Sequence, residues 1–299
     1  MVDVHTEEGI VGRSYIFTYR NSGARAIDAI FVNGVVRMAL SALDMALWDA
    51  QAHAAKLPLA ALLGGSVRPL QGYNSCGLGL KENAEAVADE AEKLLADGFN
   101  AVKLRLGYAT LAQNINAVRA VRKHVGSDVK IMVDYNQALN LHDALIRGRA
   151  LDDEGIYWLE EPIRHDDIQS HAVLTRSIKT PIQIGENFNS ALVMQQNLQA
   201  GACSLVMPDI ARIGGVTGWL QAAGVAASYG VPISSHLMPE VSAHALAASA
   251  GNHWLEWVDW ANVLLQEPIQ LKEGLAHFSD KPGSGIVWDQ AAVERFRMA

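Results

Sequence analysis

The stretch Ile-Met-Val-Asp-Tyr-Asn at residues 131–136 decides the fold, and two later stretches, YWLEEP at 157–162 and IQIGEN at 182–187, are built like it. In each, a short run rich in β-forming apolar residues leads directly to an acid. The acids are Asp134, Glu160 and Glu186, and both intervals are 26 residues long with a helical pattern inside. Consecutive βα units have this period, and parallel strands bring their carboxyl ends to one face. We therefore expect the three acids to converge.

Three converging carboxylates predict a metal site. Like charges at close range raise one another's pKa or require a cation. A hard divalent ion with oxygen ligands, Mg²⁺ first, meets that requirement and leaves positions for water or substrate. The alternative interpretation is that each acid caps the helix after it. Three acids at matching strand ends favour that interpretation less than a single acid would.

Composition limits the class of protein. The chain has 299 residues, 50% of them hydrophobic, and a formal net charge of -8, so it can bury a large core and offers no basic surface for nucleic acid. Small-molecule chemistry is the default expectation. The two cysteines, Cys76 and Cys203, suggest neither a disulfide framework nor a zinc site. With no run of 18 apolar residues and no leader-like N-terminus, we expect a soluble, cytoplasmic protein that does not bind membranes.

Strand and helix patterns alternate along most of the chain. An alternating run at 14–19 predicts a strand outside the main sheet, and 35–56 has helical spacing. Helical patterns at 82–95, 111–125, 191–200 and 217–229 lie between strand candidates. The eight candidates are 71–76, 101–107, 204–209, 232–236, 253–257 and the three strands of the opening paragraph. Eight is the number that closes a (β/α)8 barrel, an α/β fold of TIM type.

The carboxyl ends of these strands carry polar and charged residues, and in such a barrel that face carries the chemistry. The strand-end residues are Ser75, Lys103, Arg105, Asp134, Asn136, Glu160, Glu186, Asp209, His236 and Glu256.

Jointly, the strand ends resemble the mandelate racemase subgroup of the enolase superfamily (mandelate racemase/muconate lactonizing enzyme-like). The likeness runs from about residue 35 to the C-terminus. The motifs are KLR at 103–105, VDYNQ at 133–137, LEEP at 159–162, GEN at 185–187, MPD at 207–209, IGGVTGW at 213–219, SSHL at 234–237 and HWLE at 253–256.

The resemblance implies a domain plan of three segments. Residues 1–64 are expected to form part of a small α+β capping domain, 65–262 the barrel, and 263–299 a segment that returns to the cap. Relatives usually carry more N-terminal sequence, including a loop that closes over the substrate, so the cap is expected to be truncated at its N-terminus. A helical stretch is also expected to be missing between about residues 31 and 35. A homo-oligomer is implied as well.

The resemblance also implies a role for each strand-end residue. Asp134, Glu160 and Glu186 would bind Mg²⁺. Lys103 and Asn136 would contact the substrate carboxylate, with Ser75 assisting. His236 would be a general base oriented by Asp209, and Glu256 a protonated hydrogen-bond donor to the other carboxylate oxygen.

Physical chemistry supports these roles. A proton α to a carboxylate is very weakly acidic, so its removal requires stabilising a dianionic enolate, which a divalent ion, Lys103 and an acid donor can do. His236 suits a base at neutral pH, and a carboxylate behind it would hold the tautomer. The other reading of His236, a satisfied core histidine, is weakened by its strand-end position.

Arg105 departs from the family pattern. Racemases of the family carry a second lysine there, which serves as base on the face opposite the histidine. A free guanidinium group has a pKa of about 12.5 to 13.8, so forming a neutral base at pH 7 would cost roughly 7 to 9 kcal/mol. Arg105 is better suited to be a fixed charge or donor.

Three functions remain open. β-Elimination can run with one base that returns its proton to the departing hydroxyl, which favours a magnesium-dependent lyase that dehydrates a sugar acid. A mandelate-type racemase or epimerase of 2-hydroxy acids is the first alternative. A non-catalytic relative that only binds a carboxylate ligand is the second.

Overall fold

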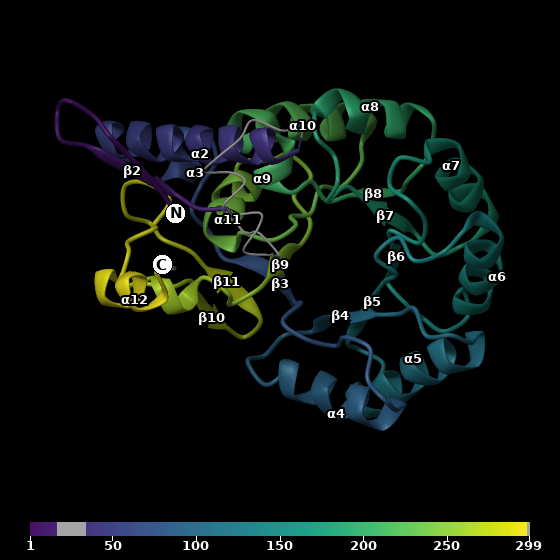
Figure 1. The fold of residues 1–299 in the computed structure, drawn as a ribbon. Coiled ribbons are helices and arrows are strands. Elements are labelled where there is room, and N and C mark those ends of the chain that lie inside the picture. Colours follow the sequence, from purple (N-terminus) through teal and green to yellow (C-terminus); the bar gives the residue numbers. More distant parts are fainter. Residues whose placement is uncertain (17–33, 298–299) are drawn as a thin grey trace.

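The computed structural model describes residues 1–16 and 34–297. A ring of short parallel strands with helices around it forms an α/β barrel, and a small hairpin with a long helix packs at one side (Figure 1). The barrel strands are β3 (Leu70–Asn74), β4 (Ala101–Arg105), β5 (Lys130–Asp134), β6 (Trp158–Glu160), β7 (Ile182–Ile184), β8 (Leu205–Val206) and β9 (Leu255–Trp257). Each strand from β3 to β7 pairs in parallel with the next one along the chain, and β9 pairs in parallel with β3.

The eighth barrel segment, at 232–236, was expected to be a strand but forms only single bridges. Ile233 bridges Val206 on one side and Asn252 on the other, and His236 bridges Asp209. Pro232 has no amide hydrogen to donate, and β8 offers only two residues, so a continuous ladder cannot form. These bridges nevertheless close the ring between β8 and β9.

Helices follow the strands and cover the outside of the ring (Figure 1). They are α4 (Ala84–Leu94), α5 (Leu111–Val125), α6 (Leu141–Leu151), α7 (Ile168–Ser177), α8 (Ala191–Gln199), α9 (Ile210–Ile213), α10 (Gly215–Tyr229) and α11 (Pro239–Ala247). The expected helices at 82–95, 111–125, 191–200 and 217–229 are confirmed to within two residues at each end. No helix in the described ranges is both long and apolar enough to cross a bilayer.

Dedicated polar residues cap the helices that follow the three acid-bearing strands. The side chains of Asn140, Asp167 and Ser190 accept the amide hydrogens at the starts of α6, α7 and α8. Asp134, Glu160 and Glu186 are therefore not the caps of these helices, and they stay available inside the ring.

An aromatic layer fills the barrel interior beneath the strand ends. Tyr73 makes edge contacts with Trp158 and Trp254 at ring-centroid distances of 5.4 and 6.5 Å. Ala101 and Met132 complete this buried cluster. Because side chains alternate along a strand, the residues two positions later point the same way, one level higher. They are Ser75, Lys103, Asp134, Glu160 and Glu256.

The N-terminal region forms a hairpin and a long helix. The hairpin pairs β1 (Val2–His5) with β2 (Val11–Ser14), and it is followed by α2 (Val35–Ala55) and α3 (Leu59–Leu62). The strand expected at 14–19 is wrong for residues 15 and 16, and 17–19 lie outside the described residues. Strand β2 ends earlier because Tyr15 leaves the hairpin to donate its hydroxyl hydrogen to Glu240, at 2.5 Å.

The C-terminal segment returns to both the barrel and the N-terminal region. It contains η1 (Asn262–Leu264), β10 (Gln270–Lys272), β11 (Leu275–His277) and α12 (Gln290–Phe296). Strand β11 pairs antiparallel with β3. Trp288 donates to Asp3 at 2.7 Å, and the Ser284 amide donates to the buried Asp49 of α2 at 2.6 Å. We keep boundaries at residues 64 and 262 as a proposed division into domains.

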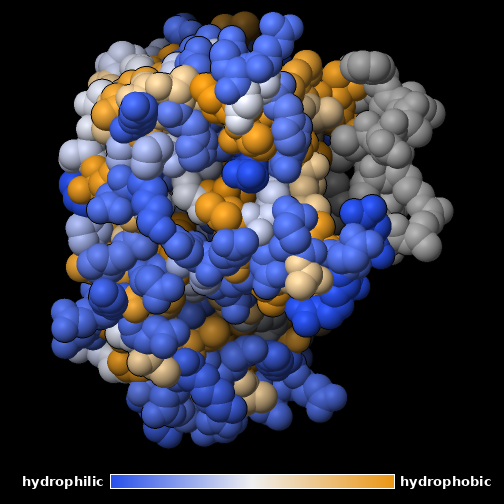
Figure 2. All heavy atoms as spheres, turned by 90° about the vertical axis from the view of Figure 1, so that its left-hand side faces the viewer, coloured by the Kyte–Doolittle hydropathy of each residue, from blue (hydrophilic) through white to orange (hydrophobic). Residues whose placement is uncertain are grey.

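The surface on this side of the molecule is mostly hydrophilic. Figure 2 looks onto it and shows hydrophobic residues in small separate groups among charged and polar ones.

Candidate active site

Three buried carboxylates meet at the carboxyl ends of β5, β6 and β7. Asp134 and Glu160 are register partners at the last positions of their strands, and Glu186 lies two residues after β7. One oxygen from each lies within 4.8 Å of the others. The convergence expected from the 26-residue period is present.

Gly185 gives Glu186 its position. Its φ is +144°, and an added Cβ would lie 2.8 Å from the amide nitrogen of Met207. Only glycine lets the chain turn here against the neighbouring strand.

The charges in this cluster are poorly balanced by the protein alone. Burial raises the pKa of Asp134 and of Glu160, Lys103 opposes the rise, and neighbouring acids add to it. The pKa of Glu186 is lowered instead, because His236 and Lys103 outweigh its burial. The positive charge near these three carboxylates is too small to balance them. Three oxygen ligands in this situation suit a hard divalent cation.

Lys103 joins the cluster from β4. Its fully buried ammonium group lies 2.9 Å from Glu160, 2.7 Å from Glu256 and 3.7 Å from Asp134. These acids raise the pKa of Lys103 well above its usual value even though burial lowers it. The lysine therefore stays charged and can bind an anionic group.

His236 and Asp209 form a hydrogen-bonded pair on the other side of the cluster. Nδ1 of His236 lies 2.8 Å from Oδ2 of Asp209, and Nε2 lies 3.2 Å from Glu186. Burial lowers the pKa of His236, but Glu186, Glu256 and Asp209 together raise it well above its usual value. A cation that takes up the charge of Glu186 would free Nε2 to accept a proton.

Glu256 differs from the protonated donor that the resemblance implies. Its carboxylate accepts hydrogen bonds from Lys103 and from the Leu237 amide, at 2.7 and 2.9 Å. Burial raises its pKa, but Lys103 and His236 outweigh burial and lower the pKa to about 2. In this arrangement Glu256 is an ionised acceptor.

Arg105 and Asn136 are held by hydrogen bonds at the rim. The Arg105 guanidinium donates to the Gly77 carbonyl oxygen at 3.1 Å and to the Ser75 hydroxyl oxygen at 3.2 Å. Asn136 has a φ of +44° and donates to Asp134 through its amide at 2.7 Å and its side chain at 3.0 Å. All ten strand-end residues thus lie at one end of the barrel.

Sequence reasoning missed three further residues of this site. Arg212, in α9, donates to the Asn187 side-chain oxygen at 2.8 Å and lies 3.5 Å from Glu186. Asn187 in turn donates to both oxygens of the buried Glu161, at 3.1 and 3.0 Å. Burial and Glu186 raise the pKa of Glu161 to about 8. The doubled acid in LEEP and a basic residue three positions after Asp209 were the available signals.

A cavity of about 460 Å³ opens above these groups. Its lining is mainly polar and comprises Lys103, Arg105, Asp134, Asn136, Gln137, Glu186, Asn187, Arg212, His236, Leu237 and Trp260.

A second, apolar cavity of about 150 Å³ lies beside it and shares Leu237 and Trp260. Tyr15 and Trp288, from the N- and C-terminal regions, line its other side.

Known proteins resemble this chain over nearly its whole length. L-talarate/galactarate dehydratase of Salmonella typhimurium is 34% identical over 260 residues, which make up 87% of this chain and 65% of the dehydratase, just under two thirds. The crystal structure of an enolase from the alpha proteobacterium BAL199 with bound magnesium is 42% identical, with a TM-score of 0.94 over 98% of this chain and 90% of that one. A Bradyrhizobium enolase in complex with magnesium and mandelic acid is 32% identical, with a TM-score of 0.91 over 99% of this chain and 90% of that one.

Two family models match as well. Residues 86–292 match the enolase C-terminal domain-like model. Residues 25–64 match the N-terminal domain of mandelate racemase and muconate lactonizing enzyme. The chain therefore belongs to the enolase superfamily, among the proteins that resemble mandelate racemase and muconate lactonizing enzyme.

Proposed function

We propose that this chain is a magnesium-dependent enzyme that removes the proton α to the carboxylate of a 2-hydroxy acid, and that it dehydrates a sugar acid. The observation that carries the proposal is the contact between His236 and Glu186, because it joins an oriented base to a three-carboxylate cation site. The polar cavity above them suits the hydroxyl groups of a sugar acid.

Asp134, Glu160 and Glu186 would hold the Mg²⁺. When bound, the ion supplies positive charge that stabilises the enolate form of the substrate carboxylate. Lys103 and Asn136 bind that carboxylate, and Ser75 assists. A substrate oxygen that draws Lys103 away from Glu256 also removes the charge that keeps Glu256 ionised, which favours the protonated donor form of Glu256.

His236 acts as the single base. Its Nε2 takes the α-proton, while Asp209 keeps the other ring proton on Nδ1. The same imidazolium then returns a proton to the departing β-hydroxyl group, so water leaves and the product enol becomes a 2-keto-3-deoxy acid. Arg105 supports a one-base reaction, because its guanidinium is committed as a donor to Ser75 and Gly77.

A racemase or epimerase is the second candidate, and the apolar cavity favours it. A hydroxy acid with an apolar substituent could place that group against Leu237 and Trp260. The mandelic acid complex of the Bradyrhizobium relative is consistent with such a substrate.

The test is proton NMR in deuterium oxide with Mg²⁺ over a panel of sugar acids and 2-hydroxy acids. The wild-type protein is compared with His236→Asn and with His142→Asn, an exposed histidine of α6 as control. We expect a sugar acid to become a 2-keto-3-deoxy product, with the rate falling about 10²- to 10⁴-fold in His236→Asn only.

Two other outcomes would reject the dehydratase. Interconversion of both enantiomers of a hydroxy acid would establish the racemase and a working base on the second face. No exchange with any acid would leave a non-catalytic carboxylate-binding relative.

We also propose a homo-oligomer and a cytoplasmic location. Leu40, Leu43 and Leu47 are exposed along one side of α2, which suits a contact between copies. Both cysteines are free, which suits a reducing compartment. Light scattering after size-exclusion chromatography tests the first point, since a monomer would reject it.

A further inference from the structure

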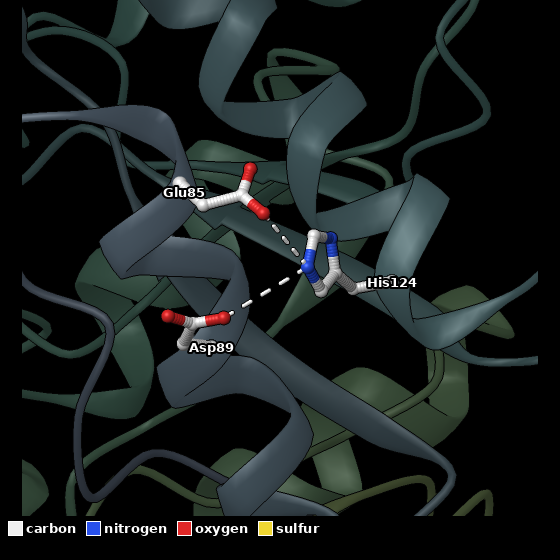
Figure 3. Close-up of side chains that lie close together, drawn as sticks. All are labelled: Glu85, Asp89 and His124. Carbon is white, nitrogen blue, oxygen red and sulfur yellow. Dashed lines mark ion pairs between the residues drawn. The ribbon is translucent and has the colours of Figure 1, made fainter.

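A histidine and two acids meet on the outer layer of helices, away from the cavity. Glu85 and Asp89 lie one turn apart on α4, and His124 lies in the last turn of α5. Figure 3 shows both carboxylates turned toward the same ring nitrogen of His124. Nε2 lies 3.2 Å from Glu85 and 3.8 Å from Asp89.

The other ring nitrogen fixes the chemistry of this contact. Nδ1 of His124 lies 3.1 Å from the carbonyl oxygen of Ala120, which can only accept a hydrogen bond. Nδ1 therefore carries the hydrogen, and in the neutral ring Nε2 presents its lone pair to two carboxylates. A cation among these three groups relieves the repulsion between that lone pair and the carboxylates.

The cation can be a proton on Nε2 or a metal ion. A backbone carbonyl behind Nδ1 is the usual support of a metal-bound histidine, because it sets the tautomer and the ring orientation. Ligands bonded at about 2.0 to 2.2 Å in a tetrahedron lie roughly 3.3 to 3.6 Å apart. The two measured contacts bracket that separation, and all three ligand atoms lie within 4.8 Å of one another.

We propose that Glu85, Asp89 and His124 bind one zinc-class divalent ion and clamp α4 to α5. An imidazole ligand favours Zn²⁺ over Mg²⁺, which prefers oxygen ligands alone. Two carboxylates neutralise the charge of the ion. The exposed side chains of Glu85 and Asp89 leave a fourth position for water.

The experiment counts bound zinc and its effect on folding. Wild-type protein at neutral pH with Mg²⁺ is titrated with ZnCl₂ by calorimetry, and its Tm is measured with and without zinc. The variants are His124→Gln and the double change Glu85→Gln with Asp89→Asn, and the control is His142→Gln. Differences between proteins isolate this site from any zinc bound by the three-carboxylate cluster.

We expect one more zinc ion per chain in the wild type and the control than in either variant, and a zinc-dependent rise in Tm that both variants lose. Mg²⁺-dependent activity is expected to be unchanged. Equal zinc counts in the wild type and both variants would overturn the proposal and leave a proton as the only cation of this cluster.

Discussion

At the scale of single residues, Asp209 serves two structural purposes. One carboxylate oxygen accepts the Ala211 amide at 2.7 Å and begins α9, and the other accepts from Nδ1 of His236 at 2.8 Å. The helix cap therefore fixes the orientation of the carboxylate that orients the base.

Asp209→Asn tests this arrangement. The asparagine oxygen can keep the cap, which leaves an NH₂ group facing His236, so Nδ1 must accept and Nε2 must carry the hydrogen. We expect kcat to fall by about 10² to 10⁴ because the base is then in the wrong tautomer. Mg²⁺ affinity measured by calorimetry should stay within a few fold. Asp167→Asn, a change at an exposed helix cap, is the control, and equal losses in the two variants would argue against the role of Asp209.

The residues of the site were predictable to different degrees. Asp134 and Glu160 end buried strands, so their convergence follows from parallel strands alone. Lys103 lies two residues before the end of β4, and His236 ends the bridged segment at 232–236. Arg212 comes to the site from a helix and Asn187 from a loop. The hydrogen bond between them depends on the length and direction of their side chains, which the periodicity of the sequence does not indicate.

At the scale of elements, close packing of β7 against β8 determines the position of Glu186 in the site. Both strands are short, and the chain after β7 passes directly over Met207 at Gly185.

Gly185→Ala should be destabilising. The new Cβ would lie 2.8 and 2.9 Å from backbone atoms of Met207, which cannot move aside without shifting β8. We expect a loss of about 1 to 3 kcal/mol in the free energy of unfolding, measured in urea, and weaker Mg²⁺ binding because Glu186 moves. Gly155→Ala is the matched control, since Gly155 also has a positive φ, +66°, but nothing lies within 4 Å of its added Cβ. Equal losses in both variants would assign the effect to φ alone.

At the scale of the whole molecule, His244 links three regions. Its Nδ1 accepts the Ala60 amide of α3 at 3.0 Å, and Nε2 lies 3.2 Å from the Ser284 carbonyl oxygen of the C-terminal segment. Both nitrogens are therefore occupied in the neutral ring, and burial lowers the pKa of His244 to about 4.

This lowered pKa predicts a loss of stability in acid. His244 binds a proton at about pH 6.5 in the unfolded chain and only at about pH 4 in the folded chain. The contribution of the neutral His244 to the free energy of unfolding is therefore fully present above pH 6.5 and is lost as the pH falls toward 4. The loss is on the order of 3 kcal/mol. Urea unfolding across this range should show a shallower pH dependence in His244→Gln than in the wild type or His142→Gln. An unchanged slope in His244→Gln would contradict the assignment.

The sequence by itself determined the barrel, the order of its units and the level at which the acids lie. Hydrophobic period and strand-end position are local properties, so they can be read along the chain. Only the tertiary structure decided that 232–236 closes the ring by single bridges, that Glu256 pairs with Lys103, and that residues 270–277 join β3. Those outcomes depend on contacts between residues that are far apart in the sequence. They also depend on how burial changes the balance between neighbouring charges.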